Sequence, residues 1–241
     1  MTGDPFHHDD DQGAGAHHRR PQDSPLGEEP SSLAADLFLI MLDDASGRLR
    51  VHPRIVGFCL VAALLVELWM GGHLVLARGR VSVVGGRPLP EDALLRGTLG
   101  WLLTDPDQAE CRPWVEALAA TAVDRMARHL EAGGWIRLVE RRRLTGQAVV
   151  YEPIDRNRVF WRTGRLTSAL ANGPTWSDVF LFVLVDAAGF TPALLVDSAS
   201  PPTRERLTAV VDRLGQVYPD VADLAGVVRA LTDRVATAPR R

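Results

Sequence analysis

The stretch PRIVGFCLVAALLVELWMGG, residues 53–72, decides the fold because it holds the longest apolar run of the chain. That run, 55–66, lies between two charged residues and is shorter than the ~18 apolar residues that a membrane-spanning helix needs. Pro53 suits the first turn of a helix, and the pair Gly71-Gly72 suits its end. We therefore predict a helix over 53–70 that forms the centre of the core and does not cross a membrane.

The plan of helix, glycine pair and hairpin occurs twice along the chain. Residues 113–132 have helical periodicity and end at Gly133-Gly134. After each glycine pair come two short segments separated by a turn, which is typical of a β-hairpin. The predicted strands are 73–78 with 81–84, turning at Gly79-Arg80, and 135–140 with 147–152, turning at 141–146. A repeated supersecondary unit and a chance likeness both explain this pattern.

Further segments have helical periodicity: 33–43, 91–103, 155–171, 176–187, 203–217 and 221–236. The predicted fold class is mainly α, a single helical domain over 33–238 with two small β-hairpins, each following a helix closed by a Gly-Gly pair. Residues 1–32 hold seven acidic residues and two arginines, among His, Gly, Pro and Ser. This composition predicts a disordered acidic, His-rich tail, which can hold a divalent ion loosely but forms no dedicated metal site.

The residue types of the chain exclude several kinds of chemistry. All 27 basic residues are arginine, so Schiff bases and P-loops are excluded. Cys59 and Cys111 are too few for a disulfide framework or a four-thiolate zinc site, and they fit a reducing cytosol. The histidines after the tail are isolated, and neither G-x-S-x-G nor H-E-x-x-H occurs. We therefore expect no catalytic residues, no cofactor and no enzymatic activity.

Positive charge is concentrated between residues 124 and 165, which hold ten arginines and five acidic residues. Arg141-Arg142-Arg143 and Leu144 occupy the predicted tip of the second hairpin. A solvated turn explains them, and so does an anionic membrane surface. That surface would gain only about 5 kcal/mol from these side chains, so it would also need a headgroup pocket or oligomeric avidity.

Nucleic acid is a further interpretation of the basic hairpin. A helix followed by a basic hairpin resembles a winged helix, whose wing contacts phosphates. Helix 113–132, with Arg125, Arg128 and His129, would then be the recognition helix. We regard nucleic acid as the less favoured partner, because such a helix needs many exposed polar donors.

Four stretches carry motifs in a fixed order and spacing. They are LAADLFLIMLDD (33–44) with Ser46-Gly47-Arg48, ALLVEL (63–68) leading to GGHL (71–74), RHLEAGGWI (128–136), and Tyr151-Glu152-Pro153. Together they resemble the Golgi phosphoprotein 3-like family over nearly everything after Ser32. The absence of lysine and the bias to Ala, Arg and Val are typical of an actinobacterial member.

This resemblance implies a fold, a function and a site. It implies a mainly helical, non-catalytic peripheral membrane protein that binds phosphatidylinositol 4-phosphate, with a hairpin that lies against the membrane or mediates oligomers. In an ungapped register, the family's headgroup tryptophan and three arginines fall at His52, Val61, Ala120 and Val123. None of the four residue types matches, so general anionic-lipid binding is expected, and selectivity for one phosphoinositide is not.

We therefore predict a cytoplasmic protein that lies peripherally on the inner face of the membrane and binds anionic, phosphoinositide-like headgroups. The predicted lipid-phosphate site is His52, Arg54, Arg125 and Arg128. The predicted membrane hairpin carries Trp135, Arg137, Arg141, Arg142, Arg143 and Leu144, and it is also the candidate contact for a protein partner or a second copy. A winged-helix-like nucleic-acid-binding regulator and a protein-interaction adaptor are the alternatives. The structural test is whether Arg54, Arg125 and Arg128 converge on one concave surface.

Overall fold

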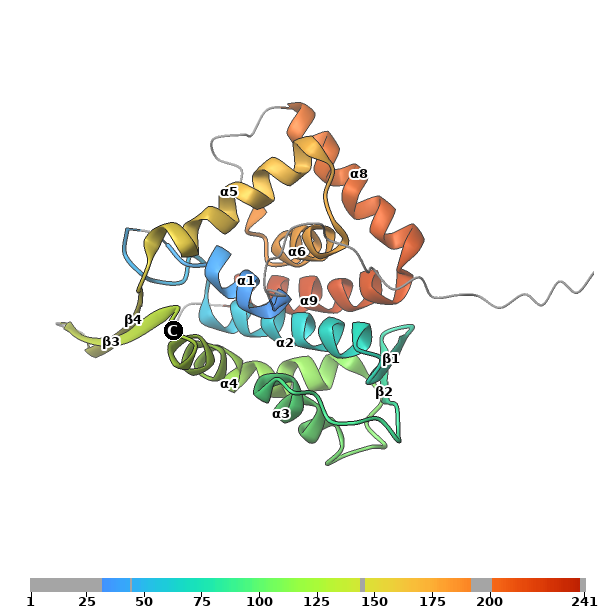
Figure 1. Cartoon of the computed structure of the whole chain (residues 1–241). Coiled ribbons are helices and arrows are strands. Elements are labelled where there is room, and N and C mark those ends of the chain that lie inside the picture. Colours follow the sequence, from blue (N-terminus) through green and yellow to red (C-terminus); the bar gives the residue numbers. More distant parts are fainter. Residues whose placement is uncertain (1–31, 44, 144–145, 192–200, 239–241) are drawn as a thin grey trace, which may run out of the picture.

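The computed structural model describes residues 32–43, 45–143, 146–191 and 201–238 (Figure 1). This part of the chain is mainly helical and has two small two-stranded antiparallel sheets, which confirms the predicted fold class. The helices are α1 (Leu33–Ile40), α2 (Pro53–Met70), α3 (Ala93–Leu102), α4 (Cys111–Ala132), α5 (Arg156–Asn172), α6 (Trp176–Ala187), α8 (Pro201–Val217) and α9 (Pro219–Thr237). The strands are β1 (Leu74–Ala77), β2 (Arg80–Val83), β3 (Ile136–Arg143) and β4 (Gly146–Pro153). The predicted tail lies outside the described residues, apart from Ser32.

Helix α2 is the centre of the core, as its sequence predicts. It packs against α1, α3, α4, α6 and α9, and Figure 1 shows it in the middle of the fold. With a mean hydropathy of 1.8 over 18 residues it is long and apolar enough to cross a membrane, but 72% of it is buried inside the protein. A core helix of a soluble protein passes the same test of length and composition.

Helices α2 and α4 lie very close together at Gly57. A Cβ atom placed on Gly57 would lie 2.5 Å from the carbonyl oxygen of Ala119, so the two backbones touch where neither helix has room for a larger side chain. This contact fixes how the N-terminal half of α2 crosses α4.

We expect Gly57→Ala to lower the free energy of unfolding by about 1–3 kcal/mol, because the added methyl group forces the two helices apart. Gly226→Ala, in the middle of α9, is the matched control. Its Cβ would meet nothing within 4 Å, so this variant should gain about 0.4–1 kcal/mol. Urea denaturation of both variants measures the difference, and equal shifts would contradict the close contact.

The N-terminus of α1 is held by a carboxylate from α2. Glu67 Oε1 accepts hydrogen bonds from Ser32 Oγ at 2.9 Å and from the backbone N–H of Ala34 at 3.0 Å. Burial raises the pKa of Glu67 to about 7, and the negative charge of Asp92 adds to this, while the two hydrogen bonds oppose it. Glu67 therefore changes charge near neutral pH.

This raised pKa makes the stability depend on pH. The folded protein holds the proton of Glu67 more tightly than the unfolded chain, so its contribution is complete below about pH 4.5 and is lost as the pH rises through about 7. Glu67→Gln keeps an oxygen acceptor and removes the titration. Over this pH range the free energy of unfolding should fall by about 1–3 kcal/mol more in the wild type than in the variant. Chemical denaturation at several pH values measures the difference. Parallel pH profiles would show that Glu67 does not carry the effect.

The two glycine pairs end their helices with the same backbone geometry. Gly72 and Gly134 have positive φ, at 72° and 70°. The next residue donates its N–H to a carbonyl five positions earlier in both cases, from His73 to Leu68 at 2.8 Å and from Trp135 to Leu130 at 2.9 Å. The repeated pattern in the sequence is therefore a repeated structural unit.

The first hairpin is short and is fixed to the rest of the fold. Its turn is Arg78-Gly79, one position earlier than predicted, because Arg80 pairs with Ala77. Both turn residues have positive φ, which is typical of a two-residue hairpin turn. The Arg78 N–H donates to Asp220 Oδ1 of α9 at 3.1 Å, and Val81 N–H donates to the Ala109 carbonyl at 2.7 Å.

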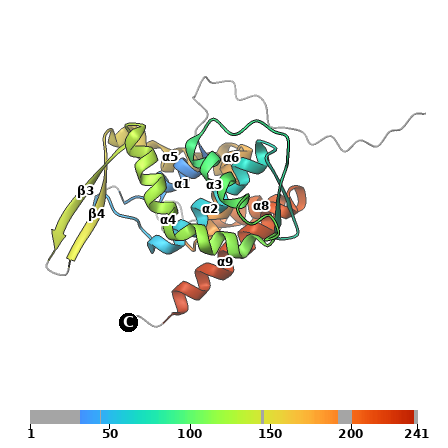
Figure 2. The ribbon, with the colours of Figure 1, turned by 90° about the horizontal axis from the view of Figure 1, so that it is seen from below.

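The second hairpin is longer than predicted and projects from the body (Figure 2). Its ladder runs from Ile136 paired with Pro153 out to Arg143 paired with Gly146. The prediction that 141–146 form the turn was therefore wrong, because Arg141-Arg142-Arg143 are the last three residues of β3. Leu144 lies outside the described residues.

Buried charges join α1, α5 and α6 and also hold the root of the second hairpin. Asp36 of α1 forms ion pairs with Arg162 and Arg165 of α5, and Arg165 reaches Asp178 of α6 at 3.0 Å. Asp36, Arg162 and Asp178 are each less than 7% exposed. The guanidinium of Arg162 also lies 4.6 Å from the ring centre of Trp135, directly before β3. This network fixes the base of the hairpin to the helices.

Candidate functional site

A hollow of about 680 Å³ opens between the N-terminal end of α2, the middle of α4 and strand β4. We call it the α2–α4 hollow. Its walls combine charged side chains with small apolar ones, contributed by Arg48, Leu49, His52, Pro53, Arg54, Glu116, Ala119, Ala120, Val123, Asp124, Val149 and Tyr151. The volume is that of a small-ligand site.

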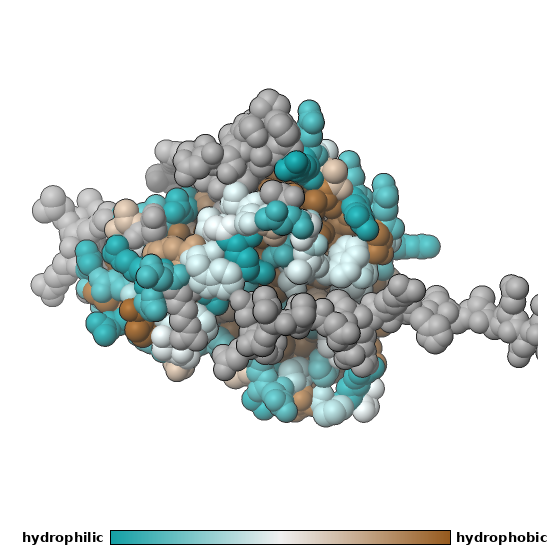
Figure 3. All heavy atoms as spheres, turned by 45° about the horizontal axis from the view of Figure 1, so that its top comes forward, coloured by the Kyte–Doolittle hydropathy of each residue, from teal (hydrophilic) through white to brown (hydrophobic). Residues whose placement is uncertain are grey.

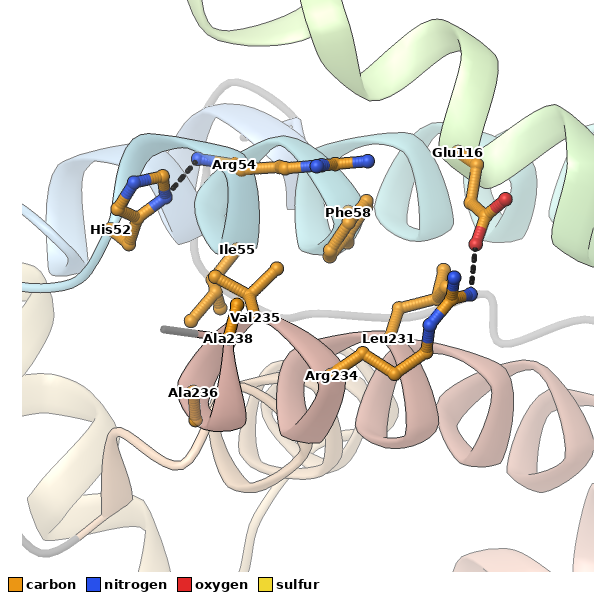
Figure 4. A pocket seen from close by; sticks show the side chains of 10 residues that line it. All are labelled: His52, Arg54, Ile55, Phe58, Glu116, Leu231, Arg234, Val235, Ala236 and Ala238. Carbon is orange, nitrogen blue, oxygen red and sulfur yellow. Dashed lines mark hydrogen bonds and ion pairs between the residues drawn. The ribbon is translucent and has the colours of Figure 1, made fainter. Parts of the chain in front are cut away.

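A second hollow of about 490 Å³ lies on the other side of Arg54, between α2 and the C-terminal turns of α9 (Figure 4). His52, Arg54 and Glu116 line both hollows. In Figure 4, Arg54 extends along α2, where its guanidinium lies 5.7 Å from the ring centre of Phe58. Arg234 of α9 closes the opposite side through an ion pair with Glu116 at 2.7 Å.

His52 has a structural role at this site. Its Nδ1 accepts a hydrogen bond from the backbone N–H of Arg54 at 3.2 Å, so the imidazole caps the N-terminus of α2. The cap holds the first turn of α2, and with it Arg54, at the edge of both hollows.

The charges in the α2–α4 hollow are nearly balanced. Arg48 and Arg54 face Glu116 and Asp124. Glu116 is already paired with Arg234, and Arg112 lies 3.7 Å away on the same helix. Asp124 forms no ion pair with any residue that the structure describes, so its charge opposes an anion in the hollow. Anion attraction there depends on the two arginines.

The structure does not bring the predicted arginines together. At 3.6 residues per turn, Arg125 lies about half a turn round α4 from Glu116. Its Nη2 approaches the Leu94 carbonyl of α3 at 3.5 Å and closely faces Gly97. Arg128 is exposed and lines neither of these two hollows. Of the predicted lipid-phosphate site, His52 and Arg54 share the hollow, and Arg125 and Arg128 lie elsewhere.

Three of the four positions that the resemblance assigns to a headgroup site line the α2–α4 hollow. His52, Ala120 and Val123 all line the α2–α4 hollow, although they come from two helices far apart in sequence. Val61 does not, because it is only 1% exposed and lies inside the core face of α2. The sequence analysis missed Arg48 as a lining residue, although Ser46-Gly47-Arg48 was among the motifs that carry the resemblance.

The residues predicted for the membrane hairpin have different surroundings. Trp135 is half-buried beneath Arg162, whereas Arg137 and Arg141 are exposed. Arg141 forms an ion pair with Glu152 at 2.6 Å across the ladder. Arg142 and Arg143 are placed by their backbone pairing with Gln147 and Gly146.

Exposed apolar side chains also lie near the hairpin and the hollow. Val149 is 47% exposed at the rim of the hollow, Ile154 is exposed between β4 and α5, and Trp161 is exposed on α5. On the face shown in Figure 3, such apolar areas are interspersed with hydrophilic side chains.

The thiols of the described chain are poor nucleophiles. Burial raises the pKa of Cys59 to about 12, and burial together with the nearby acidic groups Glu110 and Asp223 raises the pKa of Cys111 to about 12. Among the described residues, no group of three or more His, Cys, Asp or Glu side chains is placed to hold a metal ion.

Comparison with known families finds a match over most of this chain. A family model described as Golgi phosphoprotein 3 (GPP34) matches residues 33–233, which is most of the chain and nearly all of its described part. Comparison with curated proteins found no significant match. The chain therefore belongs to the Golgi phosphoprotein 3 (GPP34) family.

Proposed function

We propose that this protein is a non-catalytic, peripheral membrane protein that binds anionic phospholipid headgroups in the α2–α4 hollow. One observation carries the proposal: three of the four positions that the family resemblance assigns to the headgroup meet around one hollow that also holds two arginines. The family in general binds phosphoinositide lipids and is not known for enzymatic activity.

The chemistry of the hollow favours anionic lipids as a class over one phosphoinositide. Arg54 and Arg48 supply guanidinium groups that can bind a phosphate through two parallel hydrogen bonds. His52, Ala120 and Val123 stand where the family resemblance places a tryptophan and two arginines, so the contacts that would select a particular headgroup are missing. Asp124 weakens anion binding further.

The second hairpin supports the same function. It carries arginines to the outer end of β3 and stands away from the helices (Figure 2). Each arginine near an anionic surface contributes about 1 kcal/mol. Such an attraction is weak for a single copy, so the hairpin and the hollow would act together, or several copies would bind at once.

We expect Arg54→Ser to reduce binding to anionic vesicles by about fivefold, because one unit charge at such a surface is worth about 1 kcal/mol. Asp124→Asn should increase binding by about the same factor. Arg128→Ser is the matched control, since it removes one exposed arginine from α4 outside the hollow, and it should change binding by less than about twofold. Co-sedimentation with anionic and neutral vesicles measures all three. Equal binding to both kinds of vesicle, or equal loss in the two arginine variants, would contradict the proposal.

For the hairpin, we expect Arg142→Ser/Arg143→Ser to weaken binding to anionic vesicles by about thirtyfold, because two unit charges are removed. Arg206→Ser/Arg213→Ser removes two exposed arginines from α8 and should have a much smaller effect. The hairpin effect should fade at high salt, since charge attraction at a surface is screened. If the two double variants bind alike at low salt, the hairpin does not contact the membrane.

A further inference from the structure

A third hollow, of about 490 Å³, lies on the other side of the 43–48 turn, between that turn, strand β4 and the beginning of α5. Arg48, Arg141 and Arg156 line it, and Glu152 is the one acidic side chain among its lining residues. These three arginines come from segments far apart in sequence, so only the fold brings them together. We call this the arginine hollow.

The arginine hollow has an excess of positive charge. Glu152 is engaged by Arg141 through the ion pair at 2.6 Å. Arg48 and Arg156 form no ion pair with any described residue, and Arg156 is exposed, so the core does not require either charge. Two of the three guanidinium groups that line the hollow therefore have no ion-paired carboxylate, since Glu152 is paired with Arg141.

Hydrogen bonds and one close contact hold the floor of the hollow. The turn is closed by Asp43, whose Oδ1 accepts from the Ser46 N–H at 2.8 Å and from the Ser46 hydroxyl at 2.7 Å. Gly47 has a φ of 64° and joins the turn to the hairpin, because its carbonyl accepts from the Tyr151 N–H at 2.8 Å. A Cβ on Gly47 would lie 2.8 Å from Val150, so only glycine allows this contact. Arg48 therefore starts from a fixed backbone, which preserves the geometry of a binding site.

The two hollows lie on opposite faces of the hairpin. Along β4, Val149 and Tyr151 line the α2–α4 hollow, whereas Val150 and Glu152 line the arginine hollow, as the alternation of a strand requires. Arg48 contributes to both. The two hollows differ in their acidic residues. Asp124 of the α2–α4 hollow has no ion-pair partner among the described residues, whereas Glu152 of the arginine hollow is paired with Arg141.

We infer that the arginine hollow is a binding site for a phosphate group. The planar guanidinium group of an arginine matches the oxygens of a phosphate. Arg48 and Arg156 have no carboxylate partner among the described residues, so both guanidinium groups are available to bind a phosphate. The phosphate could belong to a soluble ion or to a lipid headgroup, and the chemistry of recognition is the same. The site does not depend on headgroup binding in the α2–α4 hollow.

The test is a calorimetric titration of the full chain with inorganic phosphate, alongside flotation with phosphatidylcholine vesicles that contain phosphatidic acid. Arg156→Ser should weaken binding by about tenfold or more in at least one arm, because it removes a charged fork from the site. Arg128→Ser, the matched control, should leave binding within about twofold. Glu152→Gln should strengthen binding, an outcome that a damaged fold cannot produce.

The two arms identify the source of the phosphate. Saturable binding of inorganic phosphate that Arg156→Ser weakens assigns the site to a soluble anion. Binding to vesicles alone, with the same dependence on Arg156, assigns it to a headgroup. A titration that Arg54→Ser weakens and Arg156→Ser does not would place the phosphate in the α2–α4 hollow and overturn the inference. Absence of binding in both arms, or equal weakening by Arg156→Ser and Arg128→Ser, would overturn the inference.

Discussion

The contact between the backbones of α2 and α4 at Gly57 and Ala119 is the constraint on which the rest of the structure depends. With no side chain at Gly57, the two helices can lie in close contact there, and the first turn of α2 stands beside the small residues of α4. Ala119 and Ala120 are too short to fill the space in front of that turn, and the α2–α4 hollow results. A larger residue at Gly57 would change the core and the hollow together.

The parts of the fold that local chemistry determines could be predicted from the sequence. Helix α2 begins at Pro53 and ends at Met70 as predicted, because a helix-starting proline and a glycine with positive φ define its two ends. The recurrence of the glycine pair after α4 predicted the second helix-hairpin unit for the same reason. These signals act within a few residues and need no information about distant contacts.

The errors concern properties that depend on tertiary contacts. The sequence placed Arg141-Arg142-Arg143 in a turn because they are polar, yet a ladder exposed to solvent can extend through charged residues. Arg125 was expected beside Arg54, but only the packing of α3 determines that it faces Leu94 and Gly97. Arg48 joins two hollows because the 43–48 turn docks on β4, which no local pattern shows. The family likeness located the hollow better than the nearest basic residues did.

The buried charges of Asp36, Arg162, Arg165 and Asp178 connect these regions. Burying ionised groups costs several kcal/mol each unless each has partners, and here the carboxylates and guanidiniums form ion pairs across three helices. Arg162 also lies over the ring of Trp135, directly before β3, so the ion pairs are connected to the base of the second hairpin. The position of the hairpin relative to the helices is therefore set at its root.

The two copies of the helix-glycine-hairpin unit differ in how far their strands extend, and this has a consequence for how the chain can vary. The first hairpin is bonded at its turn to α9 and to the segment before α4, so a change in its length would disturb both. The contacts of the second hairpin with the helices and the 43–48 turn lie toward its base, through Trp135, Leu138 and Tyr151. Its outer ladder can gain or lose a pair of residues, one on each strand, without moving a helix. We therefore expect changes of chain length to be tolerated best at the outer end of this hairpin.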